Sequence, residues 1–395
     1  MRYSIFSLMR LGFAQNEIPP QILDFSGDYR MSVHHWAAAA AVIFSLGFLD
    51  TAAPAAAKGP SAHDEARAII AAAQAIAPGG IDDLKEVEIG GIKQWIHVRG
   101  NNPANPILLV LHGGPGVPMM PESWTFQRPW EDFFTVVQWD QRGAGKTFAA
   151  AKRQIDKSIT VDRMQADAEE LIELLRRTYG KDQIFLMGYS WGSILGVRVA
   201  QHHPEWLYAY VGVGQLVDFK RNEAVGYQQT LAEAEAVGNK AAIKELKSIA
   251  PYPNSDGSLS LSKVSTERKW DVALGGMMYG KAVDTEFQGM ALSPDYTDED
   301  NKAEELGVGS TVAVLLPQLY TLSFDGISTF KCPVVFFAGA SDRTTPETLV
   351  EEFYNRIQAP AKKFVKFARA AHDVMTDAPG EMLMHLVLDV RPLAQ

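Results

Sequence analysis

Short runs of consecutive apolar residues recur along the chain, each bounded by glycine, proline or polar residues and separated from the next by a helical pattern. The clearest run is Ile107–Leu111, in which all of the residues are aliphatic. A strand without polar alternation must be covered on both faces, which is typical of parallel sheets with helices on either side. We therefore predict an α/β fold with a mostly parallel sheet and helices on both of its faces.

Other elements follow from the same patterns. Glu86–Ile89 and Ile92–Val98 flank two glycines, which indicates an antiparallel hairpin. Thr160–Tyr179 carries apolar side chains at helical spacing, with Gly180 placed to end the helix. A last helix is expected around Glu381–Val390. Further apolar runs predict buried strands at Phe133–Trp139, Gln183–Met187, Tyr208–Val213, Val334–Ala338 and Phe364–Phe367.

The alternation of strands and helices is interrupted once, between residues 216 and 328. Helical stretches such as Asn222–Ser248 prevail there, broken by the polar loop Pro251–Ser262 and the acidic stretch Asp295–Glu305. We interpret this region as a helical lid inserted over the carboxyl edge of the sheet. The predicted division is a leader or upstream extension at 1–57, a core in two parts at 58–215 and 329–395, and the lid at 216–328.

The N-terminal region contains an uncharged apolar run of 14 residues, Trp36–Leu49. A membrane-spanning helix needs about 20 such residues, whereas the core of a signal peptide needs about 7–15. The sequence Ala55-x-Ala57 that follows suits a signal peptidase. We therefore expect an exported protein, periplasmic or secreted, or a cytoplasmic one if the segment is not a signal peptide. An uncleaved segment would be its one link to a membrane.

Composition excludes several classes of function. The 395 residues include 37 Lys and Arg against 47 Asp and Glu, which argues against a surface that binds nucleic acid. The single cysteine, Cys332, excludes an internal disulfide and a cysteine-rich metal site. The sequence Gly143–Thr147 ends like a phosphate-binding loop, but Asp140 stands where that motif requires glycine. We predict no metal and no organic cofactor.

A candidate nucleophile follows the strand Gln183–Met187. The spacing Gly188-x-Ser190-x-Gly192 suits a sharp turn from strand to helix that holds a serine in strained backbone geometry. Ile194–Ala200 is a good helix, so the sequence context is the required one. The amino end of that helix offers unpaired N–H groups to a developing negative charge.

A glycine-rich loop, His112–Gly116, follows the earlier strand Ile107–Leu111. Glycines let backbone N–H groups approach a reacting oxygen, as an oxyanion hole requires. Gly113 and Gly114 are the candidates in this loop, and the backbone N–H of Trp191 is the candidate second donor. We expect His112 to orient the loop by hydrogen bonding.

A serine nucleophile needs a base, and the base needs a carboxylate that fixes its tautomer. Asp342 and His372 each follow a predicted late strand, in the order Ser, Asp, His expected of an α/β-hydrolase. Asp342 could instead cap the helix near Pro346, and His372 could be an ordinary surface histidine. Asp218 is the rival acid. His202 and His203 have the pattern of a solvated helix end.

Three motifs together resemble the proline iminopeptidase (prolyl aminopeptidase) group of α/β-hydrolases. They are the HGGPG loop His112–Gly116, the sequence Trp139–Gly143 (WDQRG) and the elbow Gly188–Ser193 (GYSWGS). The resemblance covers roughly residues 86–215 and 326–390. It implies that Ser190 is the nucleophile, His372 the general base and Asp342 its orienting acid, with Gly114 and Trp191 as oxyanion donors. The family's reaction releases an amino-terminal residue, often proline, through an acyl-enzyme.

The lid departs from the family pattern. Many members carry W-x-x-W-E there, with a glutamate that helps to hold the substrate's ammonium group, and only Trp270 of that signature is kept. Ala371 also replaces the glycine that usually precedes the base. Possible substitutes for the missing glutamate are Glu223, Glu233, Glu267 and Glu286. The predicted substrate is a short peptide or amide with a free amino terminus. The alternatives are an esterase or lactonase acting on small apolar esters and a catalytically silent ligand-binding protein.

Overall fold

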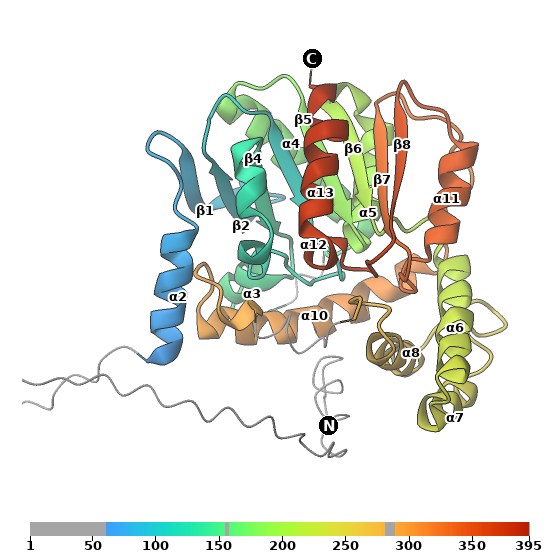
Figure 1. The fold of residues 1–395 in the computed structure, drawn as a ribbon. Helices are drawn as coiled ribbons and strands as arrows, with labels where there is room; N and C mark the ends of the chain where they lie inside the picture. The colour runs from blue at the N-terminus through green and yellow to red at the C-terminus, as the bar shows by residue number, and fades with distance from the viewer. Residues whose placement is uncertain (1–60, 155–157, 281–288, 395) are drawn as a thin grey trace, which may run out of the picture.

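An eight-stranded sheet forms the centre of the computed structural model, which describes residues 61–154, 158–280 and 289–394. Its strand order is β1-β2-β4-β3-β5-β6-β7-β8; β1, β2 and β4 pair antiparallel, and all other neighbours pair in parallel (Figure 1). The predicted leader lies outside the described residues. The strands are β1 (Ile81–Ile89), β2 (Ile92–Gly100), β3 (Ile107–Leu111), β4 (Thr135–Asp140), β5 (Ile184–Tyr189), β6 (Leu207–Val213), β7 (Val334–Gly339) and β8 (Lys362–Phe367).

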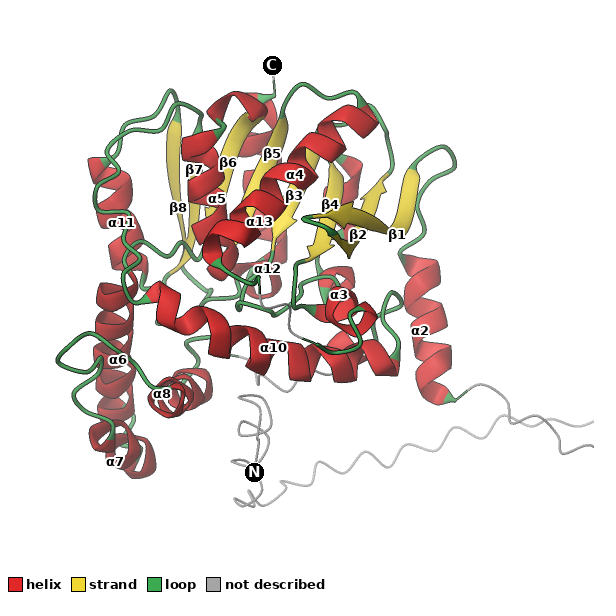
Figure 2. Cartoon of the chain, turned by 180° about the vertical axis from the view of Figure 1, so that it is seen from behind, coloured by secondary structure: helices red, strands yellow, loops and turns green. Residues whose placement is uncertain are grey.

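Helices cover both faces of this sheet (Figure 2). The α-helices are α2 (Ala62–Ala73), α3 (Gly145–Ala150), α4 (Val161–Tyr179), α5 (Trp191–His202), α6 (Phe219–Ala236), α7 (Lys240–Ser248), α8 (Leu261–Ala273), α10 (Asp298–Leu319), α11 (Glu347–Arg356), α12 (Val374–Asp377) and α13 (Pro379–His385). Shorter helical segments are η1 (Ser123–Thr125), η2 (Arg128–Asp132), η3 (Pro204–Trp206), η4 (Leu386–Val390) and η5 (Arg391–Leu393).

The apolar run in β3 is covered on both faces, as predicted. Leu109 and Leu111 pack into a core with α4 and α5, whereas Leu108 and Val110 pack into a second core with α12 and α13. All of these side chains are 0% exposed. Successive side chains of a strand point to opposite faces, so one strand contributes to two cores. The predicted α/β class with a mostly parallel sheet is therefore confirmed.

Local sequence signals predicted where several of the helices begin and end. Thr160 caps α4 by accepting a hydrogen bond from Arg163 N–H, and Gly180 ends the helix in the left-handed conformation. The stretch Asn222–Ser248 is not one helix: it divides into α6 and α7 at Gly238, whose φ is +68°. The prediction that Asp295–Glu305 interrupts the helices is wrong from Asp298 onward. Acidic residues favour a first helical turn, and here they begin α10 behind a capping box.

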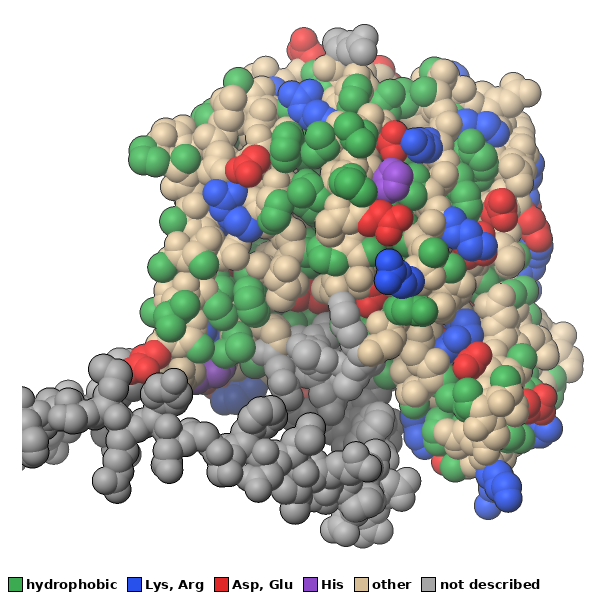
Figure 3. All heavy atoms as spheres, viewed as in Figure 1, with side chains coloured by type: hydrophobic (Ala, Val, Ile, Leu, Met, Phe, Trp, Pro, Cys, Tyr) green, Lys and Arg blue, Asp and Glu red, His purple; other side chains and the backbone are tan. Residues whose placement is uncertain are grey.

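The helices α6, α7, α8 and α10 come between β6 and β7 in the chain, where the lid was predicted. Figure 1 shows α10 running across the carboxyl ends of the strands. Within the part of the chain that the structure describes, no helix combines the length and apolar character needed to cross a bilayer. On the face shown in Figure 3, basic and acidic side chains are interspersed among hydrophobic ones.

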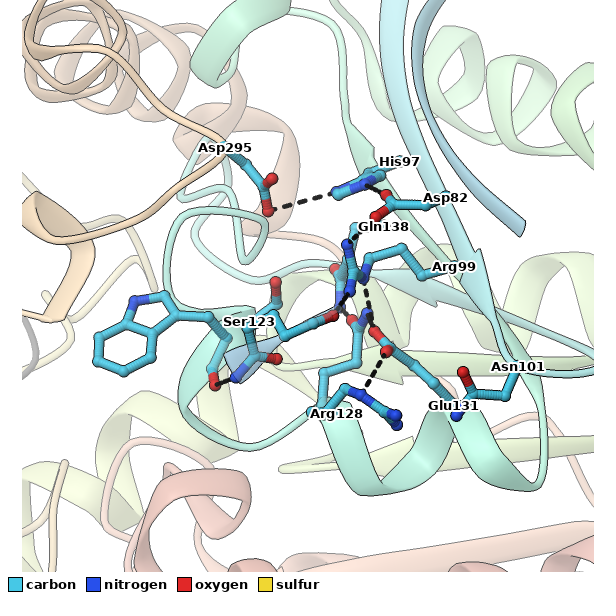
Figure 4. A network of polar contacts seen from close by, with 12 residues as sticks. Asp82, His97, Arg99, Asn101, Ser123, Arg128, Glu131, Gln138 and Asp295 are labelled. Atoms are coloured by element: carbon cyan, nitrogen blue, oxygen red, sulfur yellow. Dashed lines mark hydrogen bonds and ion pairs between the residues drawn. The ribbon is translucent and has the colours of Figure 1, made fainter. Parts of the chain in front are cut away.

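A buried polar network ties the segment before α10 to the antiparallel edge of the sheet (Figure 4). His97 on β2 is 2% exposed; its Nε2 lies 2.8 Å from Asp82 Oδ1 and its Nδ1 lies 3.3 Å from Asp295 Oδ2. Arg99 continues the network by binding Asp82 on β1 and Glu131 in η2, each at 2.8 Å. The imidazole of His97 thus joins the antiparallel edge of the sheet to the segment before α10.

The charge of His97 depends on these partners. Burial lowers the pKa of His97, but its hydrogen bonds to Asp295 and Asp82 outweigh that effect and raise the pKa above the usual value. The hydrogen bond from His97 is also the largest reason why the pKa of Asp82 is lowered. The imidazolium form therefore stabilises the contact between the lid segment and the sheet.

We expect Asp295→Asn to lower the free energy of unfolding by about 1.5–3 kcal/mol at pH 6, the range for hydrogen bonds to charged groups. The pKa of His97 is raised in the folded state. The stability that His97 contributes is therefore complete at a pH below its unfolded-state pKa of about 6.5, and it is lost as the pH rises through the folded-state pKa. The loss caused by the substitution should therefore be smaller at pH 9. Denaturant unfolding at the two pH values measures the difference.

Asp298→Asn is the matched control, because Asp298 pairs with Arg67 through a carboxylate that is 70% exposed. Exposed pairs contribute little to stability. A loss for Asp295→Asn that is the same at pH 6 and pH 9 would contradict the role given to His97.

Candidate active site

The turn between β5 and α5 holds Ser190 in strained backbone geometry, with φ 52° and ψ −119°. Few residues other than glycine adopt a positive φ. The flanking glycines permit the turn: a Cβ on Gly188 would lie 2.6 Å from the carbonyl oxygen of Gly192, and a Cβ on Gly192 would lie 2.0 Å from that of Leu111. The close packing of α5 on β3 and β5 therefore requires both glycines.

Two sets of hydrogen bonds fix this turn. The backbone N–H of Ser190 donates to the carbonyl of Val213 at the end of β6, at 2.9 Å. The hydroxyl of Ser193 donates to the carbonyl of Ser190 at 2.6 Å and accepts from the N–H of Leu216 at 3.0 Å. The position of Ser190 is thus set by the neighbouring strand as well as by its own helix.

The loop after β3 lies against the same turn, since a Cβ on Gly113 would come within 3.2 Å of Ser190 Cβ. His112 holds the loop: its Nδ1 lies 2.9 Å from the carbonyl oxygen of Gly113, and its Nε2 accepts the N–H of Gln141 at 3.2 Å. This pattern places the proton on Nδ1. Burial lowers the pKa of His112 to about 4, so the ring is neutral near pH 7 and acts through position.

Gln141 is a positioning residue that the sequence did not single out for this role. Its Nε2 donates to the carbonyl of His112 at 3.2 Å, and its Oε1 accepts the indole N–H of Trp191 at 3.1 Å. One amide therefore joins the glycine loop to the first residue of α5. The candidate oxyanion donors lie on the two segments that Gln141 connects.

Asp342 and His372 meet at the ends of β7 and β8. The Oδ2 of Asp342 lies 2.9 Å from Nδ1 of His372. Thr345 donates its hydroxyl to the same Oδ2 at 2.7 Å and its backbone N–H to Oδ1 at 2.7 Å. The two side chains are buried, with residue exposures of 3% and 2%. His372 is therefore not the ordinary surface histidine that was its alternative. Asp342 does not cap α11, whose N-cap is Pro346 without a side-chain cap hydrogen bond.

His372 also lies beside the turn that holds Ser190. Its ring centroid is 5.1 Å from that of Tyr189, the residue before Ser190. A Cβ on Gly214, which follows β6, would lie 2.9 Å from His372 Cε1. The rival acid Asp218 instead caps α6 by accepting the N–H of Arg221. The structure thus gathers the residues predicted for the site at one edge of the sheet.

A segment of the lid, residues 271–279, binds both of the loops that carry Asp342 and His372; we call it the strap. Asp271 accepts from Arg343 Nε at 3.1 Å and from the Thr344 hydroxyl at 2.8 Å. Farther along the strap, the carbonyl of Gly276 accepts the backbone N–H of His372 at 3.2 Å. The strap therefore links the two loops from the lid side.

The lid carboxylates named as possible ammonium ligands lie in different surroundings. Glu223 and Glu267 are buried, and both pair with Arg268. Glu223 also accepts the hydroxyl proton of Tyr252, and Glu267 that of Thr230 at 3.0 Å. The remaining candidates are Glu233, which is half-buried on α6, and Glu286, which lies outside the described residues.

The strained serine turn, the neighbouring glycine loop and the Asp342–His372 contact define the class of this protein. Residues 106–379 match the family described as alpha/beta hydrolase fold, and the chain belongs to that family. The match spans β3 to the start of α13 and includes every residue of the candidate site.

Comparison with individual proteins gives a more specific similarity than the family match. The chain is 30% identical over 303 residues to "Probable aminopeptidase YbaC" of Bacillus subtilis (strain 168), covering 75% of this chain and 92% of the relative. It is 33% identical over 121 residues to the proline iminopeptidase of Neisseria gonorrhoeae, covering 30% of this chain and 36% of that protein. The crystal structure of a proline iminopeptidase-related protein from Thermus thermophilus superposes with a TM-score of 0.54 at 19% identity, over 78% of this chain and 96% of that one.

We expect Asp271→Asn to reduce kcat by about 10- to 100-fold with little change in KM. The strap holds the loops of Asp342 and His372, and a small displacement of these side chains would slow the reaction strongly. The free energy of unfolding should fall by about 2–3 kcal/mol, since charged hydrogen bonds to Arg343 are weakened. Steady-state kinetics and denaturant unfolding measure the two effects.

Lys269→Ala is the control on the same helix, because Lys269 pairs with Glu245 near the surface. It should leave kcat unchanged. If Asp271→Asn lost stability but kept its kcat, the strap would hold the fold alone and would not position the catalytic loops.

Proposed function

We propose that this α/β-hydrolase is a serine hydrolase that removes an amino-terminal residue from short peptides or amides. The observation that carries the hydrolytic chemistry is the contact of Asp342 with His372 beside the strained turn of Ser190. The aminopeptidase activity is supported by the similarity to a probable aminopeptidase along nearly its whole length.

In the proposed mechanism, the Oγ of Ser190 attacks the acyl carbon while Nε2 of His372 takes its proton. Asp342 bonds Nδ1 and so keeps Nε2 available as the acceptor. Backbone N–H groups of the glycine loop and of Trp191 stabilise the oxyanion. His372 then gives its proton to the leaving amine. Water, deprotonated by His372, then attacks the acyl-enzyme, and His372 returns the proton to Oγ of Ser190 as the amino acid leaves.

An excess of buried carboxylates next to the strap supports a substrate that carries an ammonium group. Among the described residues, Glu223, Glu267 and Asp271 pair with two guanidinium groups, those of Arg268 and Arg343. Burial raises the pKa of Glu267 to about 7, so a positive charge bound beside it would favour its ionised form near neutral pH. A substrate's free amino terminus would supply that charge.

The esterase or lactonase alternative is favoured by one observation. Arg268 already pairs with both Glu223 and Glu267, and Leu274 stands at the position where the signature W-x-x-W-E has its glutamate. A lid of this kind would accept small apolar esters without binding an ammonium group.

A panel of substrates separates the two activities. Prolyl, alanyl and leucyl arylamides are compared with their N-acetylated forms and with aryl esters of short fatty acids. We expect free-amine substrates to have a kcat/KM at least tenfold above that of the blocked forms, because blocking removes the ammonium charge. Ser190→Ala should abolish turnover of every substrate.

Glu267→Gln tests the binding of the ammonium group. This substitution should lower kcat/KM for free-amine amides and leave kcat/KM for esters nearly unchanged. The control is Glu235→Gln, which changes an exposed carboxylate paired with Lys247 and should alter kcat/KM for neither class of substrate. Equal turnover of blocked and free amides would refute the aminopeptidase, and preferred turnover of the aryl esters would favour the esterase.

A further inference from the structure

Three potential metal ligands meet at the end of α5 that is remote from Ser190. His202 is the last residue of α5, His203 is its C-cap, and Glu169 lies on the neighbouring helix α4. Their ligand atoms all lie within 4.8 Å of one another. Ser190 caps the opposite end of the same 12-residue helix, roughly 18 Å away at 1.5 Å per residue. The cluster is therefore separate from the candidate active site.

The distances suit a small divalent cation. Zinc binds imidazole nitrogen and carboxylate oxygen at about 2.0–2.2 Å, so neighbouring ligands of a tetrahedral ion lie about 3.4 Å apart. Nδ1 of His202 is 2.8 Å from Oε1 of Glu169, and Nε2 of His203 is 3.9 Å from Oε2 of the same carboxylate. The first distance is shorter and the second longer than the tetrahedral spacing, and they end on the two different oxygens of Glu169. Small side-chain rotations would have to bring one of these oxygens and both nitrogens to that spacing.

Surrounding groups orient the ligands as in a metal site. Nδ1 of His203 lies 3.3 Å from a carboxylate oxygen of Glu205, which favours the tautomer with its proton on Nδ1 and leaves the Nε2 lone pair directed toward Glu169. The ring of His203 stacks on Trp206 with an interplanar angle of 2°. Gln165 donates to Oε1 of Glu169 at 2.7 Å and fixes that carboxylate.

The local field also favours a cation. The carboxyl end of a helix carries a partial negative charge and carbonyl groups without helical partners. Two carboxylates, those of Glu169 and Glu205, add formal negative charge beside the histidines. The side chain of His202 is 63% exposed, so an ion can enter from solvent and keep water ligands.

We propose that Glu169, His202 and His203 bind a divalent transition-metal ion of the zinc type, with water completing its coordination. The ion would join the end of α5 to α4 and would stabilise the folded state, because a ligand that binds only the native protein shifts the folding equilibrium toward it. It takes no part in the hydrolytic step. Its sequence signal is the pair of adjacent histidines that ends a helix.

Isothermal titration of the full-length, EDTA-treated protein with ZnCl2 tests the site, together with thermal unfolding in the same buffer. We expect one site with a Kd in the micromolar range or tighter and a rise in Tm of several degrees at saturating zinc. Cobalt(II) at the same site should give the visible absorption of a four-coordinate ion. His203→Ala and Glu169→Gln should each weaken zinc binding at least tenfold.

His385→Ala is the matched control, because His385 pairs with a single carboxylate, that of Asp389 at 2.6 Å, on a different helix. It should bind zinc as the native protein does. Circular dichroism confirms that each variant is folded, and having two independent ligand variants keeps the test decisive. Zinc binding that is unchanged in both ligand variants, or a Kd above about 1 mM in the native protein, would overturn the proposal.

Discussion

The structure depends on strands that are apolar on both faces and must therefore lie inside a helix-covered parallel sheet. Once β3 to β8 run in parallel, all of their carboxyl ends meet at one edge. Ser190, Asp342 and His372 each follow a different one of these strands, so the sheet brings together residues separated by up to 182 positions in the chain. The chemistry of the site is a consequence of this burial pattern.

The helical region between β6 and β7 is bound to the loops of the candidate site. The strap binds the loop of Asp342 through Asp271 and the loop of His372 through the carbonyl of Gly276. A second tie, from Asp295 to His97, holds the lid segment at the other side of the sheet. Each tie includes a charged pair, Asp271 with Arg343 and Asp295 with His97. The region between β6 and β7 is thus bound by specific contacts to the loops of the candidate site and to the sheet edge.

Sequence predicted the features that depend on local or periodic signals. The strands follow from apolar runs, the serine turn from the spacing of Gly188, Ser190 and Gly192, and the start of α4 from its cap Thr160. Contacts between distant charged residues leave no periodic pattern, so the pairs of Asp271 with Arg343 and of His97 with Asp295 could not be predicted. The histidines at the end of α5 were predicted to be a solvated helix end, and His202 is 63% exposed. The approach of Glu169 to them leaves no pattern in the sequence, because Glu169 lies on a different helix.

Covalent labelling tests the central claim, that Ser190, His372 and Asp342 act as one unit. A fluorophosphonate reacts with an activated serine, and intact-mass and peptide analysis locate the adduct. The account predicts one adduct on Ser190, none on Ser190→Ala, and labelling slowed by about 10³- to 10⁴-fold in His372→Gln and Asp342→Asn. Labelling of another residue, or of His372→Gln at the native rate, would contradict it.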